Sequence, residues 1–185
     1  MAGMDEFIFR PLDPNDKINK FEIERENDAL RAFLKKAAPR FHASNIAKTY
    51  VAIETGDGQK RVRSYISILN SWIRKEYANI EDCPEAEKYD YPAVKIARLA
   101  TDRHYENRGL GKTLIELVCG VITTQIMPHS GCRFLILDAN REKIDFYKRR
   151  GFTLVNNDEN LDPVCTPNPV MFMDLHKIVS KKASK

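Results

Sequence analysis

The feature that most constrains the fold is a strand pattern, a short glycine-containing turn and a helix pattern that follow one another from Val94 to Thr124. The strand pattern is an apolar run that ends at the polar Thr101-Asp102. The helix pattern is a set of apolar residues at spacings of three and four, which predicts one buried helical face. These residues are Leu110, Leu114, Leu117, Val118, Val121 and Ile122. Helices and strands also alternate elsewhere in the chain, which indicates an α/β or α+β domain with its ligand at this turn.

The turn itself reads ENRGLGKT over residues 106–113 and suits the binding of an anion. Gly109 and Gly111 lie one residue apart at the start of the helix, where the missing side chains let the backbone come close to a ligand. The unpaired N–H groups of a helix N-terminus then face that ligand, and Lys112 adds a positive charge beside it. The turn is therefore a candidate phosphate site.

Two other interpretations of the turn stay open from the residues alone. In the first, the glycines only relieve crowding between a strand and a helix, because glycine turns are common. In the second, Gly111-Lys112-Thr113 ends a nucleotide-triphosphate loop, and Phe134–Asp138 is the apolar strand that accompanies it. That loop requires glycine at position 106, where this chain has Glu106, and a carboxylate is a poor substitute for backbone that cradles a phosphate.

A second patterned block, CRFLILDANREKIDFYKRRGF, covers residues 132–152. Its apolar run predicts a buried strand, and Asn140 is placed to cap the helix that follows. Gly151 suits the position just past that helix, with basic residues in the last turn. On the residues alone, Tyr147 is better explained as a core side chain on the apolar face of this helix.

Together the two blocks resemble the GNAT superfamily of N-acetyltransferases, whose acyl-coenzyme A turn is Gln/Arg-x-x-Gly-x-Gly/Ala between a strand and a helix. Residues 106–111 match it with one departure, because Glu106 stands at the Gln/Arg position. The resemblance implies that acetyl-CoA binds at the turn, largely through main-chain groups, and along the end of the preceding strand. The implied cofactor-binding residues are Leu99, Ala100, Thr101, Glu106, Asn107, Arg108, Gly109, Leu110, Gly111, Lys112, Thr113 and Asn140.

The same resemblance gives Tyr147 a catalytic role. In the family an Asn seven residues before a Tyr contacts the pantetheine arm, and the Tyr hydroxyl protonates the departing thiolate. A phenol with a pKa of about 10 can serve a thiolate whose conjugate acid has a pKa near 8.5. The implied mechanism is direct attack of a neutral amine on the thioester, with the carbonyl polarised by backbone amides around Leu99–Thr101. Asp102, His104 and Glu106 lie near the turn, but none is a convincing general base.

The rest of the chain predicts the elements around these blocks. We expect strands at Phe7–Phe9, Thr49–Glu54, Arg61–Trp72, 153–155 and 170–175, with a hairpin turn at Gly56-Asp57-Gly58. A helix is expected from Asp28 to near Pro39. Residues 74–92 are predicted to be an exposed acidic connection and 156–169 a polar loop. Trp72 is predicted to be a core residue, with a substrate wall as the alternative. The resemblance implies one domain over residues 1–175 with a mixed, mostly antiparallel sheet flanked by helices, and acetyl-CoA in the splay after the central strand. A basic tail over 176–185, solvated or frayed, is expected to follow.

Composition excludes several classes of protein. With 185 residues, 43% hydrophobic and 30% charged, the chain can build a core and is not disordered. The first ten residues lack the apolar run of a signal peptide, and no run approaches about 18 apolar residues, so we expect a cytoplasmic protein without a membrane span. The four cysteines are widely spaced with no CxxC pair, which argues against a zinc site, other bound metal or a disulfide frame.

Most of residues 20–175 resemble, more narrowly, the GNAT toxins of bacterial toxin–antitoxin pairs, which acetylate the α-amine of an aminoacyl group on tRNA. The resemblance implies an aminoacyl-tRNA substrate and an antitoxin partner, and leaves a homodimer open. A formal charge of +4 suits a polyanionic substrate. Residues that would hold its phosphates are Lys35, Lys36, Arg40, Lys48, Arg149 and Arg150. The alternatives are a GNAT acting on a metabolite or protein amine, and a non-catalytic CoA-binding or DNA-binding module.

Overall fold

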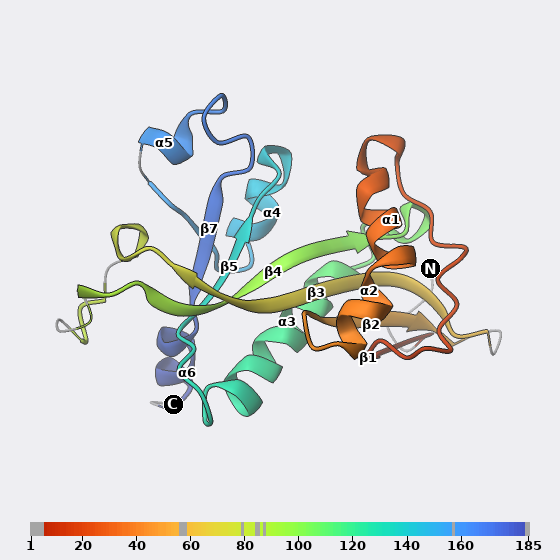
Figure 1. Ribbon diagram of the computed structural model, residues 1–185, viewed down its shortest axis with the longest axis horizontal. Coiled ribbons are helices and arrows are strands. Elements are labelled where there is room, and N and C mark those ends of the chain that lie inside the picture. The colour runs from red at the N-terminus through yellow and green to blue at the C-terminus, as the bar shows by residue number, and fades with distance from the viewer. Residues whose placement is uncertain are drawn as a thin grey trace. The chain divides into compact units, whose positions relative to one another are not determined.

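The computed structural model describes residues 6–55, 59–78, 80–83, 86, 88–156 and 158–183 (Figure 1). Hydrogen-bonded strands follow the order β1-β2-β3-β4-β5-β7-β6. The pairs β1–β2, β2–β3, β5–β7 and β6–β7 are antiparallel, and β4–β5 is parallel. With helices interspersed among these strands, the predicted α+β class and the mixed, mostly antiparallel sheet are confirmed.

The chain divides into two compact units, and β3 (Arg61–Ile73) and β4 (Tyr91–Thr101) contribute to both. The first unit comprises Met1–Leu69 and Ala97–Val118, and the second comprises Asn70–Ile96 and Cys119–Lys185. The turn at 106–113 belongs to the first unit, whereas Asn140 and Tyr147 belong to the second.

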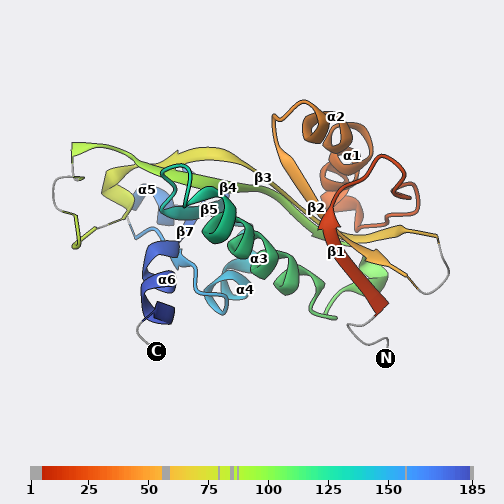
Figure 2. The same cartoon turned by 90° about the horizontal axis from the view of Figure 1, so that it is seen from below.

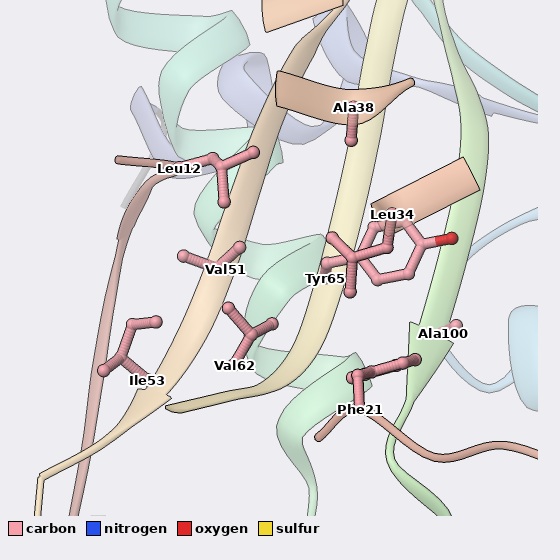
Figure 3. Close-up of a cluster of buried hydrophobic side chains, with 9 residues drawn as sticks. All are labelled: Leu12, Phe21, Leu34, Ala38, Val51, Ile53, Val62, Tyr65 and Ala100. Atoms are coloured by element: carbon pink, nitrogen blue, oxygen red, sulfur yellow. The ribbon is translucent and has the colours of Figure 1, made fainter. Parts of the chain in front are cut away.

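In the first unit, β1 (Phe7–Pro11) and β2 (Lys48–Glu54) lie beside β3 and the end of β4. On one face of these strands lie α1 (Asp28–Lys36) and α2 (Ala38–Ala43), and on the other lies the start of α3 (Leu110–Val121) (Figure 2). Because side chains alternate along a strand, neighbouring residues of β2 face opposite sides. Val51 packs with Leu34 and Tyr65 under the helices (Figure 3), while Ala52 packs with Leu110 under α3.

The second unit contains β5 (Phe134–Asp138), β6 (Thr153–Leu154) and β7 (Val170–Asp174). Its helices are α4 (Ile144–Lys148), α5 (Asp158–Leu161) and α6 (Leu175–Ala183), and a π-helical turn follows α3 at Ile122–Ile126. One buried cluster joins Phe134 and Ile136 of β5 with the end of β3, the start of β4 and the connection between these two strands. Its remaining members are Ile73, Ala78, Ile80, Tyr91 and Ala93.

Several predicted elements needed correction. Helical structure continues past Pro39, which lies in the first turn of α2, where its missing N–H costs nothing. Trp72 is 68% exposed and not a core residue, because alternation along β3 buries Ile73 instead. The connection at 74–92 is not simply exposed, since Ala78 and Ile80 are buried in it.

Two further corrections concern the end of the chain. The predicted loop 156–169 contains α5, and the amide of Asn160 is buried there. Asn160 Nδ2 donates to the Val155 carbonyl over 2.8 Å, and the Val170 N–H donates to Asn160 Oδ1 over 2.7 Å, so this amide ties the segment to the sheet. The tail predicted to be solvated or frayed is not frayed, because it forms α6 as far as Ala183; His176 and Lys177 in it are exposed, and Leu175, the first residue of α6, is buried.

The predicted strands otherwise match β1, β2, β3, β5, β6 and β7 to within a few residues, and β4 begins before the predicted apolar run. The hairpin turn predicted at 56–58 lies outside the described residues. Within the described residues, no helix is both long and apolar enough to span a membrane.

Candidate functional site

The turn after β4 has a backbone shape that requires its particular residues. Asp102 ends the strand and accepts the His104 N–H over 3.0 Å, which caps the short 3-10 helix Arg103–Tyr105. The chain then reverses through two residues with left-handed backbone, Asn107 at φ 60° and Gly109 at φ 84°. Asn and Gly tolerate this region better than other residues, because a Cβ there crowds the following carbonyl. The composition of the turn is therefore explained by its conformation as well as by ligand binding.

The start of α3 presents main-chain donors. The Thr113 N–H donates to the Gly109 carbonyl over 3.0 Å, so the helix begins at Leu110 and its first N–H groups have no partner within the helix. A Cβ added to Gly109 would meet nothing within 4 Å, so open space lies beside this glycine. Lys112 is exposed and lies 3.7 Å from Glu116. Free amides, open space and the positive end of a helix fit a bound diphosphate.

A buried ionic network lies directly behind the turn. Arg63 donates from Nε and Nη2 to Glu54 Oε2 over 2.9 and 2.7 Å, and from Nη1 to Asp102 Oδ2 over 3.4 Å. The Tyr105 hydroxyl donates to Glu54 Oε1 over 2.5 Å. Asp102 is 1% exposed and Arg63 8% exposed. Each of these buried charges faces an opposite charge and makes further hydrogen bonds, which offset the cost of burying it.

A β-bulge explains how Arg63 reaches this network. The β2–β3 register pairs Ala52 with Ser64 and Ile53 with Val62, which leaves Arg63 as the extra residue. A bulge redirects the side chain of the extra residue and increases the local twist. Val62 and Tyr65 therefore both face the core beneath α1 although they are an odd number of residues apart, while Arg63 turns to Glu54 and Asp102.

The end of β4 supplies the other residues predicted to contact the cofactor in the first unit. The β4–β5 register covers Ala93–Ile96, and the strand β4 continues beyond it to Thr101. The hydroxyl of Ser64 donates to the Ala100 carbonyl over 2.9 Å and lies 2.9 Å from the Thr101 hydroxyl. Ser64 thus fixes the strand end just before the turn, together with the bond from the Asp102 N–H to the Arg63 carbonyl.

In the second unit, Asn140 has the capping role predicted for it. Its side-chain oxygen accepts the Glu142 N–H over 3.0 Å at the start of the 3-10 helix Arg141–Lys143, and the residue is exposed. Arg141, next to it, donates to the Thr166 and Asn160 carbonyls over 2.7 and 3.3 Å. The hydrogen bonds of Arg141 to the segment that contains α5 therefore help to fix Asn140 at the end of β5.

Tyr147 is held by aromatic rings and by the end of its helix. Its ring makes edge contacts with those of Phe146 and Phe152, with centroids 5.0 and 5.7 Å apart. The Phe152 N–H donates to the Tyr147 carbonyl and the Gly151 N–H to the Lys148 carbonyl, with Gly151 at φ 87°. This is a Schellman ending, which confirms the predicted role of Gly151.

The Tyr147 hydroxyl is a donor that the protein leaves available. Among the described residues, no hydrogen-bond partner for this hydroxyl is present. Burial raises the pKa of Tyr147 to about 12, against a smaller opposing effect of Arg150. The phenol therefore keeps its proton throughout the physiological pH range, even more firmly than the sequence suggested.

The three acidic or basic groups near the turn differ in availability. Asp102 is committed to Arg63 and to the N–H groups of Glu22 and His104. His104 is largely exposed and lies 3.4 Å from Glu22. Glu106 is exposed in the turn itself. None of them resembles an activated general base, in agreement with the sequence.

The predicted substrate-binding cations occupy two places. Lys35, Lys36, Arg40 and Lys48 lie on α1, α2 and the start of β2 in the first unit. Lys35 lines an open pocket of about 340 Å³ together with Arg25, Arg31 and Arg103, and Arg31 and Arg103 are paired there with Asp28 and Glu22. Arg149 and Arg150 follow α4 in the second unit. The Arg150 guanidinium lies 3.4 Å from the Phe146 ring centroid, so this residue supports the helix of Tyr147 rather than reaching outward.

Sequence reasoning missed Glu54, Arg63 and Tyr105. Glu54 ends a predicted strand and Arg63 lies inside one, where charges are expected to face solvent. No feature of the neighbouring sequence predicts the β-bulge that brings Arg63 to Glu54. A charge in the interior of a predicted strand, as at Arg63 between Val62 and Ser64, was the available signal.

Comparisons with known proteins agree with this geometry. Three solved structures cover 93–95% of the chain: AtaT complexed with acetyl-methionyl-tRNAfMet, a Tyr-to-Phe mutant of KacT, and AtaTR bound with acetyl-CoA. Their identities to this chain are 21%, 21% and 23%, their TM-scores are 0.75, 0.75 and 0.69, and 96%, 98% and 96% of their own chains are covered. At these identities the likeness establishes the fold.

Family membership rests on the sequence match. Residues 21–152, about 70% of the chain, match the family described as the acetyltransferase (GNAT) family. This range includes both the turn with its free amides and the helix that carries Tyr147. The chain therefore belongs to the GNAT family of acetyltransferases, enzymes that use acetyl-CoA as the acetyl donor.

Proposed function

We propose that this protein transfers an acetyl group from acetyl-CoA to the α-amine of an aminoacyl-tRNA. The observation that carries the choice of acceptor is the basic surface of α1 and α2. Lys36, Arg40 and Lys48 are exposed there, and the pocket beside α1 adds Arg25, Arg31, Lys35 and Arg103 against two carboxylates. Phosphate backbones bind to such clusters of Lys and Arg. The fold likeness to AtaT with its acetyl-methionyl-tRNAfMet adds support to this choice.

The residues of the turn are assigned to the cofactor. We assign Glu106–Thr113 to the diphosphate, which the N–H groups at the start of α3 would bind. Leu99, Ala100 and Thr101 would offer main-chain groups to pantetheine and to the thioester carbonyl, and Asn140 would contact the pantetheine arm. The whole acetyltransferase domain would then extend over residues 1–175, with α6 beginning at its last residue.

Tyr147 is assigned to the departing sulfur. When the amine attacks the thioester carbonyl, the C–N bond forms, the C–S bond breaks, and negative charge develops on sulfur. The phenol donates its proton, first as a hydrogen bond, to that sulfur. The nitrogen loses one proton to solvent as the product amide forms, and solvent returns one proton to the Tyr147 phenolate, so the proton that the thiol gains is balanced. Because burial keeps the pKa of Tyr147 near 12, the donor is fully protonated at neutral pH.

A protein base is not required by this assignment. The amine must attack in its neutral form, and the ester carbonyl of an aminoacyl group lowers the pKa of the adjacent α-amine compared with a lysine side chain. Water can therefore take up the proton. This fits the commitment of Asp102 to the Arg63 network.

The experiment is incubation with labelled acetyl-CoA and a mixture of charged tRNAs, with uncharged tRNA, free amino acids and a peptide mixture as parallel acceptors. We expect label in the charged tRNA fraction, its release by mild base that cleaves the aminoacyl ester, and its loss with Tyr147→Phe. Label in free amines or peptides alone would point to the metabolite or protein acetyltransferase. Binding of acetyl-CoA without transfer to any acceptor would point to a non-catalytic module.

A toxin role is the cellular form of the same proposal. Acetylation of an aminoacyl α-amine prevents it from acting as a nucleophile in peptide-bond formation, so expression of the protein is expected to arrest translation and growth. The Tyr147→Phe variant should relieve that arrest at equal expression. A neutralising antitoxin is the expected partner, as AtaR is for AtaT. If expression of the active enzyme did not affect growth, the toxin role would be excluded, but the proposed acetyltransferase activity would not.

A further inference from the structure

Tyr105, immediately before the turn, lies between two guanidinium groups and a carboxylate. Its ring centroid is 4.4 Å from Cζ of Arg63 and 4.7 Å from Cζ of Arg108. Its hydroxyl bonds to Glu54. Only the second of these guanidinium groups belongs to the turn, so Tyr105 links the buried network to an exposed cation of the site.

Tyr105 is itself firmly held. Its ring packs edge-on against Phe7, with centroids 6.0 Å apart and planes at 89°. Glu54 accepts the hydrogen bond of the Tyr105 hydroxyl, and two hydrogen bonds from Arg63 hold the same carboxylate. Burial and the bond to the Glu54 carboxylate raise the pKa of Tyr105, which keeps its hydroxyl protonated as the donor.

Arg108 needs such a support. It is an exposed residue between Asn107 and Gly109, the two left-handed positions of the turn. An unsupported arginine there would sample many rotamers and lose entropy on meeting a ligand. The face of an aromatic ring attracts a guanidinium and restricts it while its N–H groups stay available at the edge.

The turn also carries an unusual charge, because Glu106 stands two residues before Arg108. A carboxylate beside a diphosphate site opposes binding of the anion. A guanidinium kept at the same turn offsets this opposition.

We propose that Tyr105 is a positioning residue for acetyl-CoA binding: its ring, fixed by Glu54 and Arg63, holds the Arg108 guanidinium at the turn, where it meets a cofactor phosphate. This inference rests on GNAT membership and on the assignment of the turn to the diphosphate. It is independent of the acceptor amine.

The test is a double-mutant cycle on the dissociation constant for acetyl-CoA, measured by calorimetry with the full chain and no acceptor present. The variants are Tyr105→Leu, Arg108→Met and both together. Tyr50→Phe is the matched control, because Tyr50 is a half-buried tyrosine of the same unit, and no hydroxyl partner for it is present among the described residues. Arg108→Met should weaken binding about tenfold, and Tyr105→Leu about two- to fivefold.

The cycle gives a clear decision. If Tyr105 acts through Arg108, Tyr105→Leu weakens binding in the parent and has no further effect when Arg108 is already Met. The proposal is overturned if Tyr105→Leu weakens binding equally in both backgrounds, or in neither. Should Tyr105→Leu fail to fold, Tyr105→Phe, which keeps the ring and loses the bond to Glu54, enters the same cycle with the same criterion. Loss of tRNA acetylation alone, with this coupling intact, would contradict only the proposed acceptor.

Discussion

The turn after β4 and the helix of Tyr147 are held in opposite ways. Behind the turn, two buried charges, the partly buried carboxylate of Glu54 and a tyrosine hydroxyl satisfy one another, and the first main-chain amides of α3 have no partner within the helix. Around Tyr147, packing is aromatic and the helix ends in a Schellman motif, while no hydrogen-bond partner for the phenol is present among the described residues. Polar support thus fixes the main-chain surface that we assign to the cofactor, whereas apolar support surrounds the one polar atom that we assign to proton donation.

This difference predicts that the two regions fail differently when altered. Substitutions in the network should lower both the free energy of unfolding and the affinity for acetyl-CoA. Removal of the Tyr147 hydroxyl should lower turnover alone.

The largest effect is expected from Arg63→Met. It leaves Glu54 and Asp102 without their shared cation, and removal of one partner from a buried ion pair costs about 3–5 kcal/mol of unfolding free energy. Urea denaturation measures this value. Arg61→Met, on the same strand but bonded to the exposed Gln59, is the control and should cost less than about 1 kcal/mol. Equal losses in the two variants would mean that the network does not hold this region.

Tyr147→Phe comes next. It removes the proton donor and keeps the ring that packs with Phe146 and Phe152, so turnover should fall at least about tenfold. Acetyl-CoA affinity and the melting temperature should stay close to those of the parent. Steady-state kinetics and calorimetry on the same preparation separate the two quantities. Unchanged turnover would remove Tyr147 from the acid role.

The pH dependence of Tyr147 gives a third, smaller effect. Its pKa is near 12 in the folded chain and about 10 in an unfolded one, so the unfolded chain loses this proton first as the pH rises. The resulting contribution to stability is complete below about pH 10 and is lost between pH 10 and 12. Ultraviolet titration should show that Tyr147→Phe removes a tyrosine that ionises above pH 11. If the variant instead lacked a tyrosine that ionises near pH 10 in the parent, the burial of this phenol would be contradicted.

The smallest effect is expected at Glu106. Glu106→Gln removes the carboxylate from the turn and restores a residue type usual at this position in GNAT proteins, so acetyl-CoA should bind about two- to threefold more tightly. Glu116→Gln, on the exposed side of α3 next to Lys112, is the matched control. Calorimetry in low salt and again in 0.5 M salt would show the gain shrinking as charges are screened. A weaker complex would mean that Glu106 contributes to binding.

Regular patterns made most strands, α3 and the glycine after α4 predictable from the sequence. Periodicity placed β5 and the buried face of α3, and the end of a helix placed Gly151, whereas the left-handed backbone of Gly109 was not predicted. The unpredicted features all depend on contacts between distant residues. The bulge at Arg63 breaks the alternation that a strand pattern assumes. The buried amide of Asn160 bonds to backbone groups of Val155 and Val170, which no short window of sequence reveals.

Trp72 illustrates the same limit from the other side. A large aromatic residue is usually buried, and the run that ends at Asn70-Ser71-Trp72 is largely apolar. Its exposure follows from the extension of β3 to Ile73, which directs Ile73 and not Trp72 into the cluster with Phe134. Register, more than composition, decided which of the two residues became core.

Hydrogen exchange of the protein with and without acetyl-CoA tests the central claim most directly. If the amides at the start of α3 bind the cofactor, acetyl-CoA should slow exchange in peptides covering 106–113, and Tyr147→Phe should show the same protection. Acetyl-CoA that binds, by calorimetry on the same sample, without slowing exchange at 106–113 would contradict the account.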